Sequence, residues 1–266
     1  MKAAQIKARI ISNRRLNEHY WHLEFESALI AKYADAGQFV NIRVTDGVAP
    51  LLRRPLSIHG VGAQKIKVIY EIIGKGTRIL STRKPGEFLD IIGPLGKGFD
   101  YRSLVKSSKQ NILVAPGKRN IIVGGGMGVA PLVFLAQKLK LSKPLVLIGA
   151  RSRKQILCQQ EFKSLGCTVK LATDDGSVGF KGRVTDLLRT ILEQAQPLSL
   201  FSCGPHPMLK AVAELAGIYK INAQLSLEEH MACGIGACLG CVVSTKSGYK
   251  TVCKDGPVFS SEELVW

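Results

Sequence analysis

The chain of 266 residues lacks the long apolar runs and the aromatic side chains that several protein classes need. No apolar stretch approaches the roughly 20 residues of a membrane helix. Charged residues interrupt the first 20 positions, where a signal peptide would need an apolar core. Aromatic residues make up only 6% of the chain, and no stretch alternates them with basic residues as nucleic-acid interfaces do. We therefore expect a cytoplasmic protein with no membrane segment and no nucleic-acid partner.

Acidic residues are scarce as well. The chain has 20 Asp and Glu residues and 37 Lys and Arg residues, which gives a formal net charge of +17. The basic residues are scattered along the chain rather than gathered in one stripe, so the charge favours a basic surface that steers anionic ligands. Hydrophobic residues make up 46% of the chain, enough to bury a core and to exclude a disordered protein.

The pattern of apolar residues changes near position 105. Before it, apolar and polar residues alternate at 21–25, 40–44 and 66–70, which predicts a small antiparallel barrel. After it, buried strands are expected at 120–123, 144–149, 168–173, 197–203 and 222–227, with amphipathic helices at 132–139, 184–191 and 209–213. Pro131 suits the first turn of the first helix. Alternating strands and helices predict a doubly wound parallel sheet.

Three parts follow from these patterns. We expect a β-barrel domain at 1–105, an α/β domain at 106–225 and a small C-terminal subdomain at 226–266. The last part is rich in Gly and Cys and too short to bury a core of its own. An interaction other than hydrophobic packing must therefore hold it together.

Cysteine supplies that interaction. The chain has seven cysteines, an odd number, and cytosolic proteins rarely contain structural disulfides, so metal or redox chemistry is expected. Cys233, Cys238, Cys241 and Cys253 follow the spacing C-x4-C-x2-C, then eleven residues, then C. That spacing is typical of plant-type [2Fe–2S] proteins. A four-cysteine zinc site is the alternative, but zinc sites usually pair two C-x2-C motifs, and only one is present here.

The residues around the cysteines suit a loop that wraps a cluster. Gly234, Gly236 and Gly240 permit positive φ values and close approach of the backbone. The N–H groups of such an irregular loop are expected to hydrogen-bond to the sulfurs. Cys158 and Cys167, on an expected helix and beside a strand, are interpreted as small buried apolar residues rather than ligands.

Two glycine-containing motifs in the first domain suit a nucleotide. RRPLSIHG (53–60) is followed by GKGT (74–77). Arg54 offers a fork suited to a pyrophosphate, Ser57 a hydroxyl that can meet a heterocycle, and Gly76 a close approach of the backbone. Each motif alone is also compatible with an ordinary turn of a barrel.

Two further motifs lie in the second domain. GGGMGVAP (124–131) joins a strand to a helix, where a dinucleotide phosphate would meet helix N–H groups. It departs from the G-x-G-x-x-G fingerprint, because Val129 occupies the third glycine position. CGPHPM (203–208) ends a later strand and places Cys203 at the carboxyl edge of the sheet, where ligands of such folds bind.

The order of these motifs resembles the ferredoxin–NADP reductase-like superfamily. ACGIGACLGC (232–241) with VCKDGPVF, together with TDDGSVGFKGRVTDLL (173–188), is most similar to the electron transfer subunits of class B dihydroorotate dehydrogenases. The resemblance implies FAD binding by Arg54, Pro55, Leu56, Ser57, Ile69, Tyr70, Glu71, Gly76 and Thr77, NAD binding by Gly124, Gly125, Gly126, Gly128, Cys203, Gly204 and Pro205, and [2Fe–2S] ligation by Cys233, Cys238, Cys241 and Cys253. Leu56 stands where many members of the superfamily have Tyr. No nucleophile or general base is implied.

The resemblance also implies a reaction path in pyrimidine biosynthesis. Dihydroorotate is oxidised at FMN in a separate catalytic subunit, and electrons then pass through the cluster and FAD to NAD⁺. A heterotetramer with two copies of each chain is expected. Two alternatives stay open: a related NAD(P)H-linked subunit that serves sulfide, sulfite or ferredoxin, and a basic binding module with structural zinc. Arg151 and Arg153 follow an expected strand where a 2′-phosphate could bind, so NADP also stays open.

Overall fold

The computed structural model describes residues 3–104, 119–195 and 197–266, and this part of the chain forms two compact units. The barrel unit comprises Met1–Gly98, Glu229–Val243 and Tyr249–Pro257, and the sheet unit comprises Phe99–Glu228, Ser244–Gly248 and Val258–Trp266. The predicted boundary between residues 105 and 106 lies outside the described residues. The division into three parts stays a prediction.

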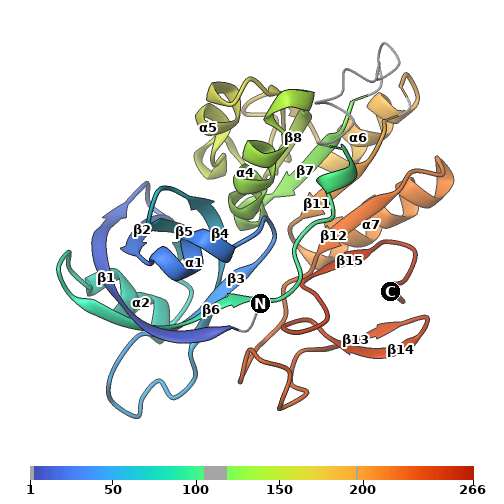
Figure 1. Cartoon of the computed structure of the whole chain (residues 1–266). Coiled ribbons are helices and arrows are strands. Elements are labelled where there is room, and N and C mark those ends of the chain that lie inside the picture. The colour runs from blue at the N-terminus through green and yellow to red at the C-terminus, as the bar shows by residue number, and fades with distance from the viewer. Residues whose placement is uncertain (1–2, 105–118, 196) are drawn as a thin grey trace. The chain divides into compact units, whose positions relative to one another are not determined.

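Antiparallel strands close the barrel in the order β1-β2-β5-β4-β3-β6 (Figure 1). These strands are β1 (Ala4–Arg15), β2 (Tyr20–Glu26), β3 (Phe39–Arg43), β4 (Arg54–Val61), β5 (Lys65–Glu71) and β6 (Phe88–Leu95). Two helices belong to the same unit, α1 (Ala28–Tyr33) and α2 (Lys75–Thr82). The predicted antiparallel barrel is confirmed.

Apolar and polar residues alternate along these strands, and the apolar ones form the interior of the barrel. Leu23 pairs with Val68, and Phe25 pairs with Ile66, across β2 and β5. All four side chains are buried, because alternate residues of a strand point to the same face of the sheet. Each side chain of this size stabilises the fold by about 1.5–3 kcal/mol when it leaves water.

The sheet unit contains strands in the order β10-β9-β8-β7-β11-β12-β15. They are β7 (Ile121–Gly125), β8 (Leu145–Ala150), β9 (Thr168–Thr173), β10 (Phe180–Lys181), β11 (Leu200–Cys203), β12 (Ala223–Ser226) and β15 (Val258–Ser260). The strands from β10 to β12 are parallel, as predicted, whereas β15 is antiparallel to β12. The sequence pattern did not predict this edge strand, which comes from the cysteine-rich C-terminal part.

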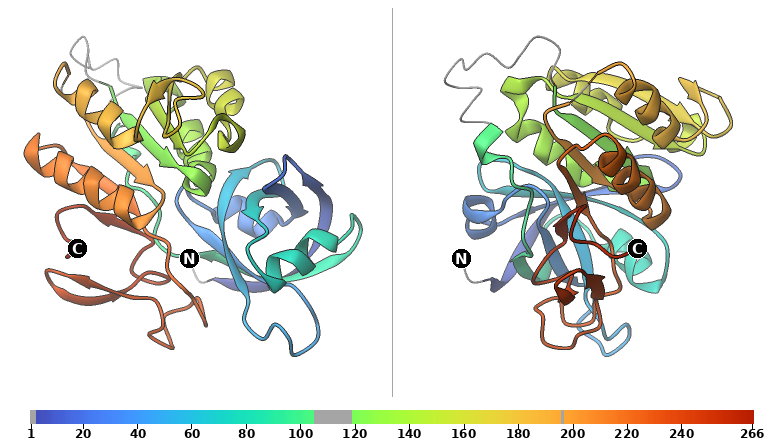
Figure 2. Two further views of the ribbon diagram at one scale, coloured as in Figure 1. Left: turned by 180° about the vertical axis from the view of Figure 1, so that it is seen from behind. Right: turned by 90° about the vertical axis from the view of Figure 1, so that its right-hand side faces the viewer.

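Helices cover both faces of the sheet, as a doubly wound fold requires (Figure 2). The helices are η1 (Gly126–Gly128), α4 (Val129–Lys138), η2 (Lys140–Ser142), η3 (Arg153–Gln155), α5 (Gln159–Ser164), α6 (Val184–Leu192) and α7 (His206–Ile218). Helices α4 and α5 contact one another, and so do α6 and α7. Pro131 lies in the first turn of α4, as predicted. No helix of the described residues is long and apolar enough to cross a membrane.

The C-terminal part of the chain contributes to both units. Residues 229–241 form an irregular segment, which leads into a two-stranded sheet of β13 (Val242–Thr245) and β14 (Gly248–Thr251). The turn after β14 carries the buried residues Val252 and Cys253. This turn and the irregular segment belong to the barrel unit, whereas β15 belongs to the sheet unit.

Helix α2 is tied to the barrel at its C-terminal end by one amide. The Asn13 side chain donates to the carbonyl oxygens of Leu80 and Arg83 at 2.8 and 2.9 Å, and it accepts a hydrogen bond from the Tyr70 hydroxyl at 2.9 Å. The last carbonyls of a helix have no partner within the helix, so Asn13 satisfies groups that would otherwise need water. Because the Tyr70 hydroxyl donates to Asn13 Oδ1, the Nδ2 group of Asn13 is the one that points at the helix.

We expect Asn13→Ala to lower the free energy of unfolding by about 2–3 kcal/mol, because it leaves two carbonyls and a buried hydroxyl without partners. Urea denaturation followed by tryptophan fluorescence measures the change. Asn222→Ala, at an exposed position, is the control. An Asn13→Ala midpoint equal to that of the control would contradict the role assigned to this amide.

Candidate functional site

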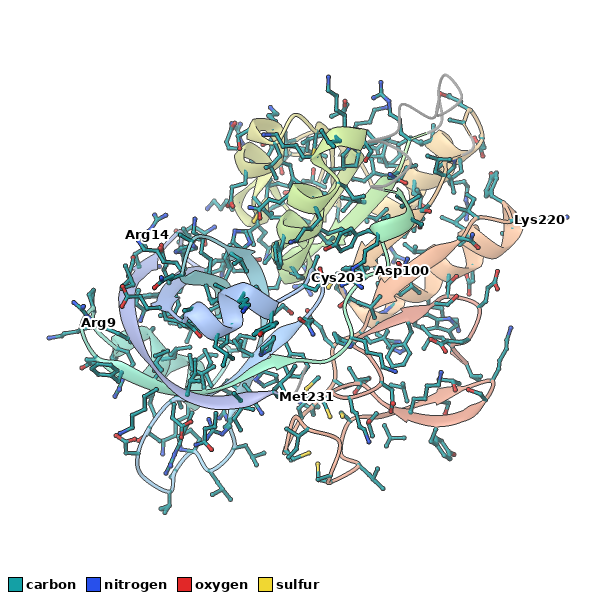
Figure 3. All side chains as sticks on the ribbon, in the orientation of Figure 1. Arg9, Arg14, Asp100, Cys203, Lys220 and Met231 are labelled. Atoms are coloured by element: carbon teal, nitrogen blue, oxygen red, sulfur yellow. The ribbon has the colours of Figure 1, made fainter. Side chains whose placement is uncertain are left out.

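The four cysteines of the predicted cluster motif lie in the barrel unit, on the irregular segment 229–241 and the turn after β14. Sulfur atoms gather in the chain near the labelled Met231 (Figure 3). Cys241 and Cys253 are buried, Cys233 is half-buried and Cys238 is exposed. One edge of the group therefore reaches the molecular surface.

Three successive backbone amides point at thiol sulfurs. Ile235 and Ala237 donate to Cys233 Sγ at 3.4 and 3.3 Å, and Gly236 donates to Cys253 Sγ at 3.1 Å. Hydrogen bonds of this kind favour the thiolate over the thiol and hold it in place as a metal ligand. The prediction that free N–H groups of the loop would bond to sulfur is confirmed.

Backbone conformation explains how the amides converge. Gly234 and Gly236 have φ values of 72° and 83°, as predicted. The prediction was wrong for Gly240, whose φ lies outside the left-handed region; Leu239 adopts it instead, with φ 56°. A residue with a side chain is strained in this conformation by about 1–3 kcal/mol, so the loop is held by forces beyond its own propensity.

The thiols influence one another. Cys238 contributes to the pKa of Cys233 and Cys241 to that of Cys253, and the Cys253 amide donates to Cys241 Sγ at 3.4 Å. Burial raises the pKa of the Cys233 thiol, but the hydrogen bonds from Ile235, Cys238 and Ala237 outweigh burial and bring it down to about 6. Burial and the neighbouring Cys241 raise the pKa of Cys253 to about 12.

This donor set fits a [2Fe–2S] cluster. Four thiolates crowded together repel one another and need bound cations to offset the repulsion. Four cysteines with the spacing C-x4-C-x2-C and a distant fourth are the ligand set of plant-type [2Fe–2S] clusters. Zinc sites usually pair two C-x2-C motifs instead.

The two arginines of RRPLS have different partners. Arg53 donates from Nη2 to the Asp90 carboxylate and from Nη1 to the Asp90 carbonyl, both at 2.9 Å. Within the described residues Arg54 bonds only to the carbonyls of Leu52 and Arg53, so no carboxylate neutralises its charge there. A Cβ at Gly76 would collide with the Arg54 guanidinium. Arg54 therefore lies directly beside the first turn of α2.

The first turn of α2 and Arg54 together make a site for an anion. Gly74 precedes the helix, and Thr77 Oγ1 accepts from the Ile73 and Gly74 amides at 3.1 and 3.4 Å. The remaining N–H groups of the turn and the positive end of the helix favour negative charge. An unpaired guanidinium beside them adds a full positive charge, so the arrangement suits a phosphate or pyrophosphate.

The other predicted flavin residues fall into two groups. Residues 55–57 are half-buried on β4 and keep surface for a ligand. Ile69 and Tyr70 on β5 are buried, and the Tyr70 hydroxyl is occupied by Asn13. The next residue, Glu71, is half-buried. At Ile69 and Tyr70 the chain thus offers main-chain groups rather than side chains.

The two motifs predicted for NAD lie together in the sheet unit. Gly124 on β7 pairs with Cys203 on β11, where the parallel strands end, and Figure 3 shows Cys203 at that strand end. A Cβ at Gly128 would collide with the backbone of Cys203 and Gly204, and one at Gly125 would lie 2.5 Å from the Met208 sulfur. Glycine is therefore required for this close packing of the two loops. The amides at the start of α4 lie beside them, as expected of a phosphate site.

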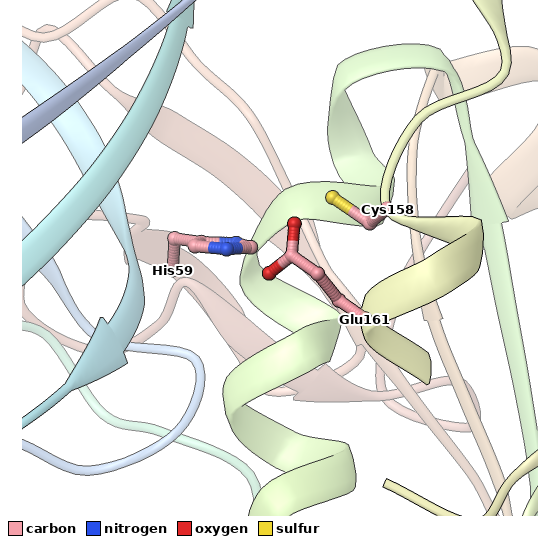
Figure 4. Close-up of side chains that lie close together, drawn as sticks. All are labelled: His59, Cys158 and Glu161. Carbon is pink, nitrogen blue, oxygen red and sulfur yellow. The ribbon is translucent and has the colours of Figure 1, made fainter. Parts of the chain in front are cut away.

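The remaining cysteines are buried and protonated at neutral pH. Burial raises the pKa of Cys203 well above its ordinary value, and Glu228 raises it further. Burial also raises the pKa of Cys158, with a further contribution from Glu161 on α5 (Figure 4), and raises that of Cys167 to about 11. Cys158 precedes α5 rather than lying on it. Cys158 and Cys167 are small buried residues, as predicted.

Sequence reasoning missed three contributors to these sites. Asn41 was interpreted as an outward residue of an alternating strand, yet it is buried and donates to the carbonyl of Cys233 at 3.3 Å. Arg53 was assigned no role, yet it binds the Asp90 carboxylate and the main-chain carbonyl of Asn41. Leu239 adopts the positive φ value that was expected of its neighbour Gly240. A polar residue among the apolar residues FVNIRV was the one local signal for Asn41.

Comparisons with known proteins match these sites. The family model described as "Oxidoreductase NAD-binding domain" matches residues 122–214. The model for the "Iron-sulfur cluster binding domain of dihydroorotate dehydrogenase B" matches residues 228–265. A protein of Desulforamulus reducens is 38% identical over 97% of both chains, and one of Bacillus velezensis is 40% identical over 99% of both. Both are named dihydroorotate dehydrogenase B (NAD(+)), electron transfer subunit.

Solved structures agree with the fold. An NADH-dependent reduced ferredoxin-NADP oxidoreductase has a TM-score of 0.82 at 28% identity, covering 97% of this chain and 90% of that one. Ferredoxin-NADP+ reductase from Plasmodium falciparum has a TM-score of 0.63 at 14% identity, covering 83% and 96%, and shows the fold alone.

These matches confirm the predicted oxidoreductase and its cofactors, FAD, a [2Fe–2S] cluster and NAD. They leave the alternative of a binding module with structural zinc without support. The two relatives align with nearly the whole chain at 38% and 40% identity. The chain therefore belongs to the family of electron transfer subunits of dihydroorotate dehydrogenase B (NAD(+)).

Proposed function

We propose that this chain receives electrons from an FMN-containing catalytic subunit that oxidises dihydroorotate, and delivers them to NAD⁺. The observation that carries the proposal is that amides 235–237 donate to the sulfurs of Cys233 and Cys253, with Cys238 of the same motif exposed at the surface. Single electrons can pass between two subunits only when a redox centre lies close to the surface. The relatives are named electron transfer subunits, and that name implies a catalytic partner subunit.

The residues of the chain bind and orient the redox groups rather than transfer protons. FAD, when bound, can exchange hydride with a nicotinamide and single electrons with an iron–sulfur cluster. We assign Arg54 and the first turn of α2, with Thr77, to its pyrophosphate. Residues 55–57 and 69–71 would line the rest of the flavin nucleotide.

The nicotinamide dinucleotide belongs to the sheet unit in this proposal. The loop 124–128 would hold its phosphates against the start of α4, and residues 203–205 would adjoin the nicotinamide. Cys203 stays protonated in this role, because burial raises its pKa. We assign NAD rather than NADP, in keeping with the relatives' name; Arg151 and Arg153 are exposed after β8, and their role as 2′-phosphate ligands stays a prediction.

The surface beside the cysteines suits a protein partner. Ile235, Leu239 and Tyr249 are exposed to 53%, 66% and 81%. A shallow hollow of about 320 Å³ lies there, lined by Leu239 and Tyr249 and by the charged residues Lys250, Lys254 and Asp255. Apolar side chains in a rim that is positive on balance favour docking of another protein with an acidic rim. We propose that the catalytic subunit covers this surface, in a cytoplasmic heterotetramer with two copies of each chain.

Co-purification with the FMN subunit, followed by an assay of NAD⁺ reduction by dihydroorotate, tests the function. We expect turnover by the complex and none by either subunit alone. Turnover with sulfide, sulfite or reduced ferredoxin, but none with dihydroorotate, would replace this proposal with the related electron transfer function.

We expect Cys238→Ser to bleach the iron–sulfur absorption and to slow NAD⁺ reduction by dihydroorotate at least about 100-fold, beyond what the loss of a supporting hydrogen bond costs. NADH oxidation by ferricyanide, which needs FAD alone, should persist. Cys167→Ala removes a buried thiol elsewhere and serves as the control. Full dihydroorotate turnover by Cys238→Ser would refute the electron path.

Arg54→Gln should weaken FAD binding by about 10- to 100-fold, because it removes a charge-assisted hydrogen bond to the pyrophosphate. Equilibrium dialysis with flavin fluorescence measures the affinity. Arg78→Gln removes an exposed charge from helix α2, whose first turn lies beside Arg54, and should change affinity less than about threefold. Equal losses in both variants would mean that general charge, rather than the position of Arg54, holds the flavin nucleotide.

A further inference from the structure

A buried amide of the barrel touches the cysteine loop. The side chain of Asn41, on β3, is 0% exposed, and its Nδ2 donates to the main-chain carbonyl of Cys233 at 3.3 Å. Both residues belong to the barrel unit. A carbonyl oxygen can only accept a hydrogen bond, so the amide must present its nitrogen to the loop.

The side-chain amide of Asn41 also leaves no room for a side chain at position 234, the residue after Cys233. A Cβ at Gly234 would lie 2.5 Å from Asn41 Nδ2, closer than any real contact. Gly234 also has φ 72°, which places its neighbours on opposite sides of a tight bend. Asn41 and Gly234 therefore fit one another, and the bend brings the amides of residues 235–237 onto the sulfurs.

Folding alone does not favour an amide at this position. Asn41 Oδ1 is buried and has no hydrogen-bond partner within the described residues. Its neighbour across the strand pair is Pro55, whose nitrogen has no hydrogen to donate. An unsatisfied buried oxygen is destabilising, and leucine, a somewhat larger side chain with the same branching, would remove that penalty.

Asn41 also connects the loop with the RRPLS segment. Its main-chain carbonyl accepts from Arg53 Nη1 at 3.5 Å, and Arg53 is fixed by Asp90. The residue after Arg53 is the arginine that we assign to FAD. One short stretch of β3 and β4 thus lies between the cysteine loop and the proposed flavin site.

We propose that Asn41 is a positioning residue that holds the cysteine loop in its ligand geometry, through the Cys233 carbonyl and the bend at Gly234. The inference rests on the proposed function only in taking the four cysteines as iron–sulfur ligands. Asn41 does not ligate the cluster; it acts through the main chain of a residue that does.

The test compares iron release to a ferrous chelator from anaerobically purified full-length chain and its Asn41→Leu variant. We expect release about tenfold faster in the variant, the factor that one net hydrogen bond supplies. Hydrogen exchange at amides 235–237 should quicken, while bound FAD and the unfolding midpoint stay at the level of the unmodified chain. Equal release rates with normal FAD content would overturn the proposal.

A matched control separates this role from the general effect of losing a buried amide. Asn120, in the sheet unit, is also buried with an unpartnered Oδ1, and its Nδ2 donates to Ser142 Oγ at 3.2 Å. Asn120→Leu should leave iron release and exchange at amides 235–237 unchanged. Faster release in Asn120→Leu, to the same degree as in Asn41→Leu, would also overturn the proposal.

A double-mutant cycle decides the matter should Asn41→Leu fail to bind FAD. Gly234→Ala should lose iron quickly because its methyl group meets Asn41. Adding Asn41→Ala should then restore part of the retention, since the obstacle is removed, although the strain at φ 72° persists. Purely additive effects would refute the coupling.

The two proposals fail in different ways. A chain that retains its cluster but does not couple to dihydroorotate overturns the proposed function and leaves the iron-release comparison valid. A chain purified without air that carries no iron–sulfur centre overturns both.

Discussion

Hydrogen bonds from backbone amides to cysteine sulfurs are the interaction on which the C-terminal part of this protein depends. Burial makes charge on Cys253 unfavourable and raises its pKa to about 12, while hydrogen bonds at Cys233 lower the pKa there to about 6. Deprotonation is thus favoured at Cys233 and disfavoured at Cys253, where a bound cation would offset the negative charge. The strained backbone at Leu239 is compatible with the same view, because ligand bonds can hold a conformation that the loop alone would not favour.

Main-chain amides, rather than acidic or basic side chains, do most of the binding that we assign to this chain. They donate to sulfurs at residues 235–237, and they begin helices α2 and α4, where we assign the phosphate groups. Glycines let the backbone approach closely at each place, as at Gly76 beside Arg54 and Gly128 beside the Cys203 loop. Such a design suits a protein that positions redox groups and leaves the electron chemistry to them.

Patterns with a short period were enough to predict most of the fold. Alternation in β2 and β5 predicted a barrel interior that includes Leu23 and Val68. Pro131 and the apolar spacing after it predicted α4 nearly to its bounds. Edge strand β15 escaped prediction because its three residues pair only with β12, more than 30 positions earlier in the chain. Contacts at such separation leave no local pattern.

The amino-acid sequence alone determined which chemistry the chain can support, because the ligands of a [2Fe–2S] cluster and the turns that cradle phosphates are specified by spacing and by residue type. Tertiary structure decided which neighbours each of these residues meets. Arg53 pairs with Asp90, whereas Arg54 has no carboxylate partner within the described residues. Tyr70 is buried with its hydroxyl bonded to Asn13, and Asn41 turns inward to meet the cysteine loop. These choices depend on which neighbours packing brings from distant parts of the chain, and no residue carries that information within its own segment.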